Sequence, residues 1–361
     1  MSQTFFYCSD LSRASGERSF GTASVGEVWL LVEYREAWGT HALEDSALPA
    51  VVKRHLNNFC QTVPRARLLF VKRERVRPEP PVCFVVRCRE RAPSIERFEL
   101  NTYEDLLQFD LAALAAGGAP GGVKLETPLY LVCTHGKRDK CCAKFGYALY
   151  KSLRAGEASG DGEGEAAGDS DSEASGVGGD GKATGAGGNS SGGETAVDSD
   201  VEGGGRIWQS SHVGGDRFAA NLVCFPHGLF YAHVTEDAGR RIVAEYAHRR
   251  LTLEGYRGRA CYSYPVQAAE FFIRTETKLD ALDALRYRRH ERTGERSWRV
   301  TFVESLATTG DGAGARIHEA HVAARPSEFR NYITCGAAEE RRVIQYALED
   351  YGVTGGDARV E

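Results

Sequence analysis

Apolar and amphipathic stretches follow one another in a regular order in the first 120 residues. Short apolar runs at residues 28–34, 68–71 and 82–86 have the length and composition of buried β-strands. Between the first two runs, Pro49 opens a stretch whose apolar side chains recur at helical spacing, and Thr102 opens a second such stretch. The pattern predicts a strand–helix–strand–strand–helix unit.

The same order returns in the next part of the chain. Its segments are predicted strands at 129–133, 207–212, 221–225 and 229–234, with helices at 142–153 and after Thr235. Two layers joined by a right-handed crossover make such a unit thioredoxin-like. We therefore expect an α/β (α+β) fold with tandem thioredoxin-like βαββα units, related by topology and not by evident sequence identity.

The last hundred residues combine both periodicities. Pro265 begins an amphipathic helix, residues 297–303 alternate like a strand, and residues 315–323 have the pattern of its partner strand. A further helix is expected to follow Cys335 and to end near Tyr351. This part is predicted to be a C-terminal α+β extension. The expected domains are residues 1–120, residues 121–260 and residues 261–361.

Residues 155–205 differ in composition from the chain around them. They hold 17 glycines, twelve acidic residues and one basic residue, a net charge of −11. Such a segment buries too little apolar area to offset its ordering entropy, so we expect a disordered, flexible acidic insert within the second unit. Because the net charge of the chain is −5, the remainder carries +6.

Signals for secretion or membrane insertion are not visible in the sequence. The first ten residues lack a basic region followed by an apolar core, and no run reaches the ~20 apolar residues of a membrane span. Ten scattered cysteines are too few for a disulfide scaffold. We expect a cytoplasmic protein with reduced thiols and no membrane partner. No aromatic–basic pattern typical of nucleic-acid binding is present, so no nucleic-acid partner is expected.

Candidate metal-ligating residues form two motifs, one on each side of the acidic insert. Cys133 ends a strand-like run, and Cys142 follows after eight residues that include three basic ones. His212 ends another strand-like run and is separated from Asp216 by three residues. Thiolate and imidazole groups are ligands of iron and zinc. Basic neighbours and a helix start favour the thiolate form, so the two motifs predict a metal site.

These motifs resemble those of the sucrase/ferredoxin-like family, whose members have a thioredoxin-like ferredoxin domain. The resemblance implies a 2Fe–2S cluster held by two cysteines and two histidines, with ligands at Cys133, Cys142 and His212. The second histidine of the family, in a His-x-Gly-Gly-His pattern, falls on Asp216, which is the expected fourth ligand. The word sucrase finds no support, because no paired-carboxylate hydrolase arrangement is found in the sequence.

Neighbouring residues provide alternative ligands and supporting groups. Cys141 and Cys224 are second choices as ligands, although adjacent cysteines on a helix point about 100° apart and only one faces a given site. His135 is expected to hydrogen-bond a ligand sulfur, and Arg217 to neutralise cluster charge. The other cysteines show no metal-ligand spacing; they are Cys8, Cys60, Cys83, Cys88, Cys261 and Cys335.

The sequence favours an electron-transfer or redox-sensing protein with a 2Fe–2S cluster and a redox partner protein of unknown identity. A non-catalytic electron carrier fits better than a hydrolase. The alternative is a zinc-binding or metal-free thioredoxin-like interaction module that has lost the cluster. A third class, a thiol oxidoreductase, fits least well, because no Cys-x-x-Cys lies at a helix start.

Overall fold

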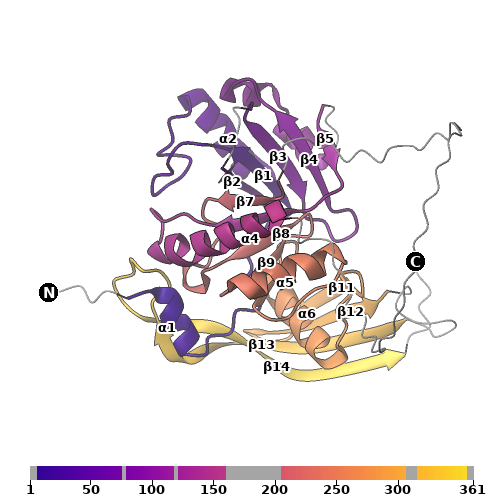
Figure 1. Ribbon diagram of the computed structural model, residues 1–361. Coiled ribbons are helices and arrows are strands. Elements are labelled where there is room, and N and C mark those ends of the chain that lie inside the picture. Colours follow the sequence, from indigo (N-terminus) through magenta and orange to yellow (C-terminus); the bar gives the residue numbers. More distant parts are fainter. Residues whose placement is uncertain (1–5, 75–78, 118–120, 160–204, 306–314, 356–361) are drawn as a thin grey trace, which may run out of the picture.

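Two β-sheets organise the chain in the computed structural model (Figure 1). The structure describes residues 6–74, 79–117, 121–159, 205–305 and 315–355. The larger sheet has ten strands and is mixed, and the smaller sheet has four antiparallel strands. Helices accompany both sheets, so the predicted α+β class is confirmed.

The N-terminal half of the large sheet follows the predicted order with two additional strands. Its strands are β1 (Val28–Glu33), β2 (Ala66–Lys72), β3 (Val82–Arg87), β4 (Ser94–Glu99) and β5 (Val123–Leu125). Its helices are α2 (Ala50–Thr62), the 3-10 helix η1 (Tyr103–Gln108) and α3 (Leu111–Ala116). β1 is parallel to β2 and antiparallel to β3. The sequence pattern predicted neither β4 nor the three-residue strand β5, because polar residues interrupt the apolar positions of both strands.

The second half repeats this arrangement. Its strands are β6 (Leu129–Cys133), β7 (Ile207–Ser210), β8 (Leu222–Phe225), β9 (Leu229–Tyr231) and β10 (Tyr256–Arg259). Its helical segments are η2 (Cys142–Gly146), α4 (Tyr147–Ser159), η3 (Asp216–Phe218) and α5 (Glu236–Ala247). β6 is parallel to β7 and antiparallel to β8, as β1 is to β2 and β3. Figure 1 shows α4 and α5 beside this part of the sheet.

The two halves meet at β2 and β7, which pair antiparallel through Val71 with Ser210 and Lys72 with Gln209. The strand order is therefore β10-β9-β8-β6-β7-β2-β1-β3-β4-β5, in which each half mirrors the other. The repeated strand order agrees with the predicted tandem topology. The assignment of each half to the thioredoxin-like fold, and the domain boundaries, stay predictions.

Both faces of the large sheet are buried at its central strands, which explains why β1, β3, β6 and β8 are almost entirely apolar. On β1, Leu30 and Val32 face a core under α2, whereas Trp29 and Leu31 face the opposite core. That second core extends across both halves of the sheet and includes Cys133. The end of β6 therefore places a thiol in an apolar layer shared by the two halves.

The C-terminal part forms the small sheet and a helix that packs on it. Its elements are α6 (Tyr264–Thr277), β11 (Leu285–Arg292), β12 (Ser297–Glu304), β13 (Arg316–Asn331) and β14 (Arg341–Gly355). The prediction of a helix that ends near Tyr351 is wrong, because this segment forms strand β14. The helix propensity of its residues is outweighed by backbone pairing with β13. This pairing also buries the side chains of Val343 and Tyr346.

The N-terminal helix α1 (Cys8–Ala14) lies beside this last part of the chain, although more than 300 residues separate them. It packs against η3 and β13, and Figure 1 shows it next to the β13–β14 hairpin. The acidic insert was predicted from residue 155, but α4 continues to Ser159, and residues 160–204 lie outside the described part. No helix in the described ranges is both long and apolar enough to span a bilayer.

Candidate metal centre

The two predicted motifs meet at one edge of the large sheet. Cys133 is the last residue of β6 and pairs with Ser210, the last residue of β7. Because these strands are parallel, the segments that follow them leave the sheet at the same edge. The first of these segments leads to Cys142, and the second carries His212 two residues after β7. The strand pairing thus joins two motifs that are 70 residues apart.

Cys142 begins the η2 segment, which has π-helical hydrogen bonding and runs directly into α4. A π-helical turn is uncommon and is found mostly as a single turn at functional sites. In this chain it sets the direction of the Cys142 side chain relative to the end of β6. Cys141 precedes it, and the two neighbouring thiols diverge into different groups.

The conformation of the loop after His212 depends on two glycines and a buried arginine. Gly214 and Gly215 have φ angles of +93° and +84°, which favour glycine. A Cβ atom on Gly215 would also lie 2.6 Å from Nη2 of Arg257. The Arg257 guanidinium donates to the carbonyl oxygen of Gly214 and to Oδ1 of Asn221. These contacts fix the path of the chain between His212 and Asp216.

We call Cys133, Cys142 and His212 the Cys–His centre. One ligand atom from each of these residues lies within 4.8 Å of the other two. Both thiols are almost fully buried, whereas 25% of the His212 side chain is exposed. The centre therefore has two sulfur donors in an apolar layer and one imidazole that reaches the surface.

Asp216 is buried next to this centre. Its Oδ1 atom lies 3.0 Å from Nδ1 of His212 and 3.9 Å from Sγ of Cys142. The contact with His212 is close but is not aligned as a hydrogen bond, so we describe it as an ion pair. The His212 Nδ1 atom is thus a buried donor without an aligned hydrogen-bond partner among the described residues. A carboxylate in this place can bind a shared ion or orient the imidazole.

The contacts within the centre favour the charged forms of Cys133 and His212, whereas the hydrogen bond to Cys133 and burial raise the pKa of Cys142. The pKa of Cys133 is held well below its usual value, first by the hydrogen bond from Cys142 and then by His212. Burial would lower the pKa of His212, but Asp216 and Cys133 beside it raise this pKa to about 9. Metal binding requires a thiolate and a neutral imidazole. A metal ion at this centre would therefore displace the protons that Cys142 and His212 carry.

The structure places the other predicted residues differently. His135 is buried, its Nε2 atom lies 2.6 Å from the carbonyl oxygen of Gly39, and its backbone N–H reaches Cys133. Arg217 forms an ion pair with Glu17, at 2.5 Å. Cys224 lies on β8, where it pairs with Tyr130 of β6. Its side chain belongs to the core on the opposite face from Cys133, so the structure does not bring it to the centre.

A second group of sulfur atoms lies beside the first. We call it the three-cysteine cluster, and it consists of Cys8, Cys141 and Cys335 with the carboxylate of Asp139. Its residues come from α1, from the loop after β6 and from the connection between β13 and β14. The structure thus assigns Cys141, predicted as a rival ligand of the first site, to a separate cluster.

Sequence reasoning missed this cluster because its members share no motif. Cys8 and Cys335 are 327 residues apart, and each is isolated from other cysteines in the sequence. The one local signal is the adjacency of Cys141 and Cys142, since neighbouring side chains on a helical segment point in different directions. That adjacency predicts that one of the two thiols points away from the Cys–His centre and contacts other residues.

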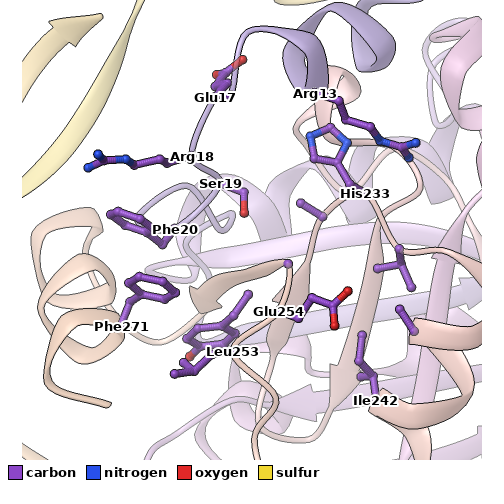
Figure 2. A pocket seen from close by; sticks show the side chains of 16 residues that line it. Arg13, Glu17, Arg18, Ser19, Phe20, His233, Ile242, Leu253, Glu254 and Phe271 are labelled. Carbon is purple, nitrogen blue, oxygen red and sulfur yellow. The ribbon is translucent and has the colours of Figure 1, made fainter. Parts of the chain in front are cut away.

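A pocket of about 470 Å³ lies on another side of α1, between the chain after that helix, the segment before β10 and α6 (Figure 2). Figure 2 shows Phe20 facing Phe271, whose rings are stacked at 4.2 Å, and Arg13 next to His233. Hydroxyl groups of Ser9 and Ser12 lie within 3.4 Å of the His233 ring nitrogens. The pocket lining includes no residue of either cysteine group.

Comparison with known proteins agrees with the resemblance of the motifs. No curated protein and no solved structure matches the chain. The family model described as sucrase/ferredoxin-like matches residues 19–258, well over half of the chain. This match covers the ten-stranded sheet except for the last residue of β10, together with both motifs of the Cys–His centre. The chain therefore belongs to the sucrase/ferredoxin-like family.

Proposed function

We propose that this chain binds a 2Fe–2S cluster at the Cys–His centre and works as an electron-transfer or redox-sensing protein. The observation that carries the proposal is the convergence of two buried thiols and one imidazole within 4.8 Å. Thiolate and imidazole are ligands of biological 2Fe–2S clusters. The chemistry of these donors fits the cofactor, and Asp216 supplies the fourth donor.

The side chains around the centre suit an electron carrier. A bound cluster supplies a one-electron couple, and the protein controls its potential through ligand type, charge and burial. Cys133 and Cys142 keep water away from one side, while His212 is exposed and offers a path to the surface. Asp216 adds a negative charge beside His212, which lowers the potential relative to an imidazole in its place.

The exposed loop next to Cys133 supports docking of a redox partner protein. Lys137 and Arg138 are exposed on this loop, and Lys140 is partly exposed. Clustered positive charge attracts an acidic surface and increases the rate of encounter. We therefore propose an acidic partner protein that approaches from the side of this loop. Such binding is expected to weaken as salt is added.

A zinc-binding module is the second candidate, and one observation favours it. All three donor atoms lie within 4.8 Å of one another, which suits a single tetrahedral ion. A 2Fe–2S cluster is larger than a single ion, so Cys133, Cys142 and His212 would have to move apart to hold it. If zinc is bound, the same residues are ligands of a structural ion and the protein does not transfer electrons.

Iron and sulfide content with visible absorption distinguish the two candidates. The protein is purified without oxygen after iron-replete expression, alongside Cys133→Ser and the control Cys224→Ser. We expect about two irons and two sulfides per chain, with a visible absorption that dithionite bleaches. Cys133→Ser should lose both iron and colour, whereas Cys224→Ser should keep them. Colourless wild-type protein with zinc that is lost in Cys133→Ser would replace the proposal with the zinc candidate.

A further inference from the structure

The three sulfur atoms of the three-cysteine cluster contact one another mutually. The Sγ atoms of Cys8 and Cys141 are 3.6 Å apart, those of Cys141 and Cys335 are 3.3 Å apart, and those of Cys8 and Cys335 are 3.5 Å apart. They form a nearly equilateral triangle. The carboxylate oxygens of Asp139 lie 4.0 Å and 3.9 Å from the Cys8 sulfur.

This triangle has the dimensions of a metal-binding face. Two thiolates bound to one zinc ion at about 2.3 Å in a tetrahedron lie about 3.8 Å apart, and a carboxylate oxygen lies about 3.5 Å from each sulfur. The observed separations differ from those values by at most about 0.5 Å. A disulfide requires about 2.05 Å between two sulfurs and leaves the third thiol unused. Three mutual contacts therefore fit a shared ion better than a disulfide.

Asp139 is a buried carboxylate that lacks a cationic partner. Only 3% of the residue is exposed, and among the described residues no lysine, arginine or histidine forms an ion pair with it. Its Oδ1 accepts a hydrogen bond from the backbone N–H of Cys141 at 2.8 Å, and its Oδ2 accepts one from Cys335 at 2.7 Å. Burying a carboxylate is costly unless a positive charge compensates it. A divalent ion at the cluster supplies that charge.

Backbone N–H groups around the sulfurs complete the environment of a thiolate site. The N–H of Cys8 points to the Cys335 sulfur at 3.4 Å, and the N–H of Ser9 points to the Cys141 sulfur at 3.5 Å. Donors directed at sulfur stabilise its charged form. Each of the three segments thus contributes both a ligand and a supporting contact.

We propose that the three-cysteine cluster and Asp139 bind one structural zinc ion. Three thiolates and one carboxylate form a closed tetrahedral set, as structural zinc requires. The ion would join α1 and the β13–β14 connection to the loop after β6. Cys8 and Cys335 lie outside residues 19–258, so the site joins both ends of this chain to the region that the family model matches.

The zinc site would also support the neighbouring Cys–His centre, although it does not rest on the function proposed for that centre. Cys141 directly precedes Cys142, and α1 packs against η3, which contains Asp216. Fixing Cys8 and Cys141 on one ion therefore holds two segments that border the Cys–His centre. The two sites differ in ligands, so each can be removed separately.

Metal analysis of the full chain tests the proposal. We expect about one zinc per chain that Cys335→Ser and Cys8→Ser lose, while Cys133→Ser and the control Cys261→Ser retain it. Cobalt substituted for zinc should give thiolate-to-metal absorption that disappears in Cys335→Ser and persists in Cys133→Ser. Absence of zinc from wild-type protein, or zinc retained by Cys335→Ser and lost by Cys133→Ser, would overturn the assignment. Iron content, measured in parallel, reports on the Cys–His centre alone.

Alkylation of the wild-type protein gives a result even where the cysteine variants fail to fold. Iodoacetamide should label the exposed Cys60 at once, but should label Cys8, Cys141 and Cys335 only after a zinc chelator is added. Peptide mass spectrometry identifies each labelled thiol. Labelling of all three thiols at the same rate without chelator, or a disulfide between any two of them, would contradict zinc binding.

Discussion

Gly146 packs directly against the carbonyl oxygen of Cys133. A Cβ atom at Gly146 would lie 2.0 Å from this oxygen, which belongs to the backbone and cannot rotate away. The last residue of η2 therefore has to be glycine for the π-helical turn to approach the end of β6. This approach places Cys142 next to Cys133, so the geometry of the Cys–His centre depends on a residue that provides no ligand.

We expect Gly146→Ala to destabilise the protein by about 1–3 kcal/mol or more, because the added methyl group forces η2 away from β6. Metal bound at the Cys–His centre should fall as well. Gly156→Ala is the matched control, because a Cβ atom there meets nothing within 4 Å and α4 should gain about 0.5–1 kcal/mol. Urea unfolding and metal analysis measure both effects. Equal stability of the two variants would show that η2 does not constrain the centre.

Asp216 should control the potential of the proposed cluster. Asp216→His replaces an anionic donor with a neutral imidazole, so we expect the reduction potential to rise on the order of 100 mV. Asp216→Asn keeps the size of the side chain and removes its charge, and should raise the potential by less if an amide still contacts His212. Redox titration followed by electron paramagnetic resonance measures these shifts. Potentials equal to that of the wild type in both variants would exclude Asp216 as a ligand.

A buried ion-pair network should be more important for stability than any surface pair. Glu270 on α6 lies 2.9 Å from Nε of Arg259 and 3.1 Å from Nε of Arg274, and it accepts a hydrogen bond from Tyr256. Glu270→Ala leaves two buried guanidinium groups unpaired, so we expect a loss of about 3–5 kcal/mol in the free energy of unfolding. Glu254→Ala breaks the exposed pair with Arg241 and should cost at most about 1 kcal/mol. Chemical denaturation that gives similar losses for both would disprove the role of the network.

His227 should make the protein less stable at acidic pH. Its Nδ1 atom lies 2.5 Å from the Tyr246 hydroxyl, and burial together with Arg259 lowers its pKa to about 3. Between pH of about 6.5 and 3 the unfolded chain takes up a proton that folded His227 does not. Stability therefore falls as the pH falls through this window, by at most about 1.4 kcal/mol per pH unit.

The His227→Gln variant should reduce this slope while preserving a hydrogen bond to Tyr246. Part of the slope should remain, because burial also lowers the pKa of His233, to about 4. The exposed His41→Gln serves as the control and should leave the slope unchanged. Urea unfolding at several pH values between 5 and 7.5 provides the comparison. A His227→Gln slope identical to that of the wild type would show that His227 does not contribute.

Local patterns were sufficient for most of the large sheet. The apolar runs that became β1, β3 and β6 are buried on both faces, so their composition alone distinguishes them from surface segments. The segment 341–355 shows the limit of this reasoning. Its residues favour a helix, but pairing with β13 buries Val343 and Tyr346 and decides the conformation.

The sequence by itself determined which residues form the Cys–His centre, because these residues lie in two short motifs at the ends of recognisable strands. Spacing and side-chain chemistry are local properties, so they can be recognised from the sequence alone. The three-cysteine cluster is formed by tertiary packing and could not be identified from the sequence. Cys8 and Cys335 meet Cys141 only because α1 and the β13–β14 connection pack against the loop after β6. Contacts between segments 327 residues apart arise from the packing of complete elements, and no local pattern records them.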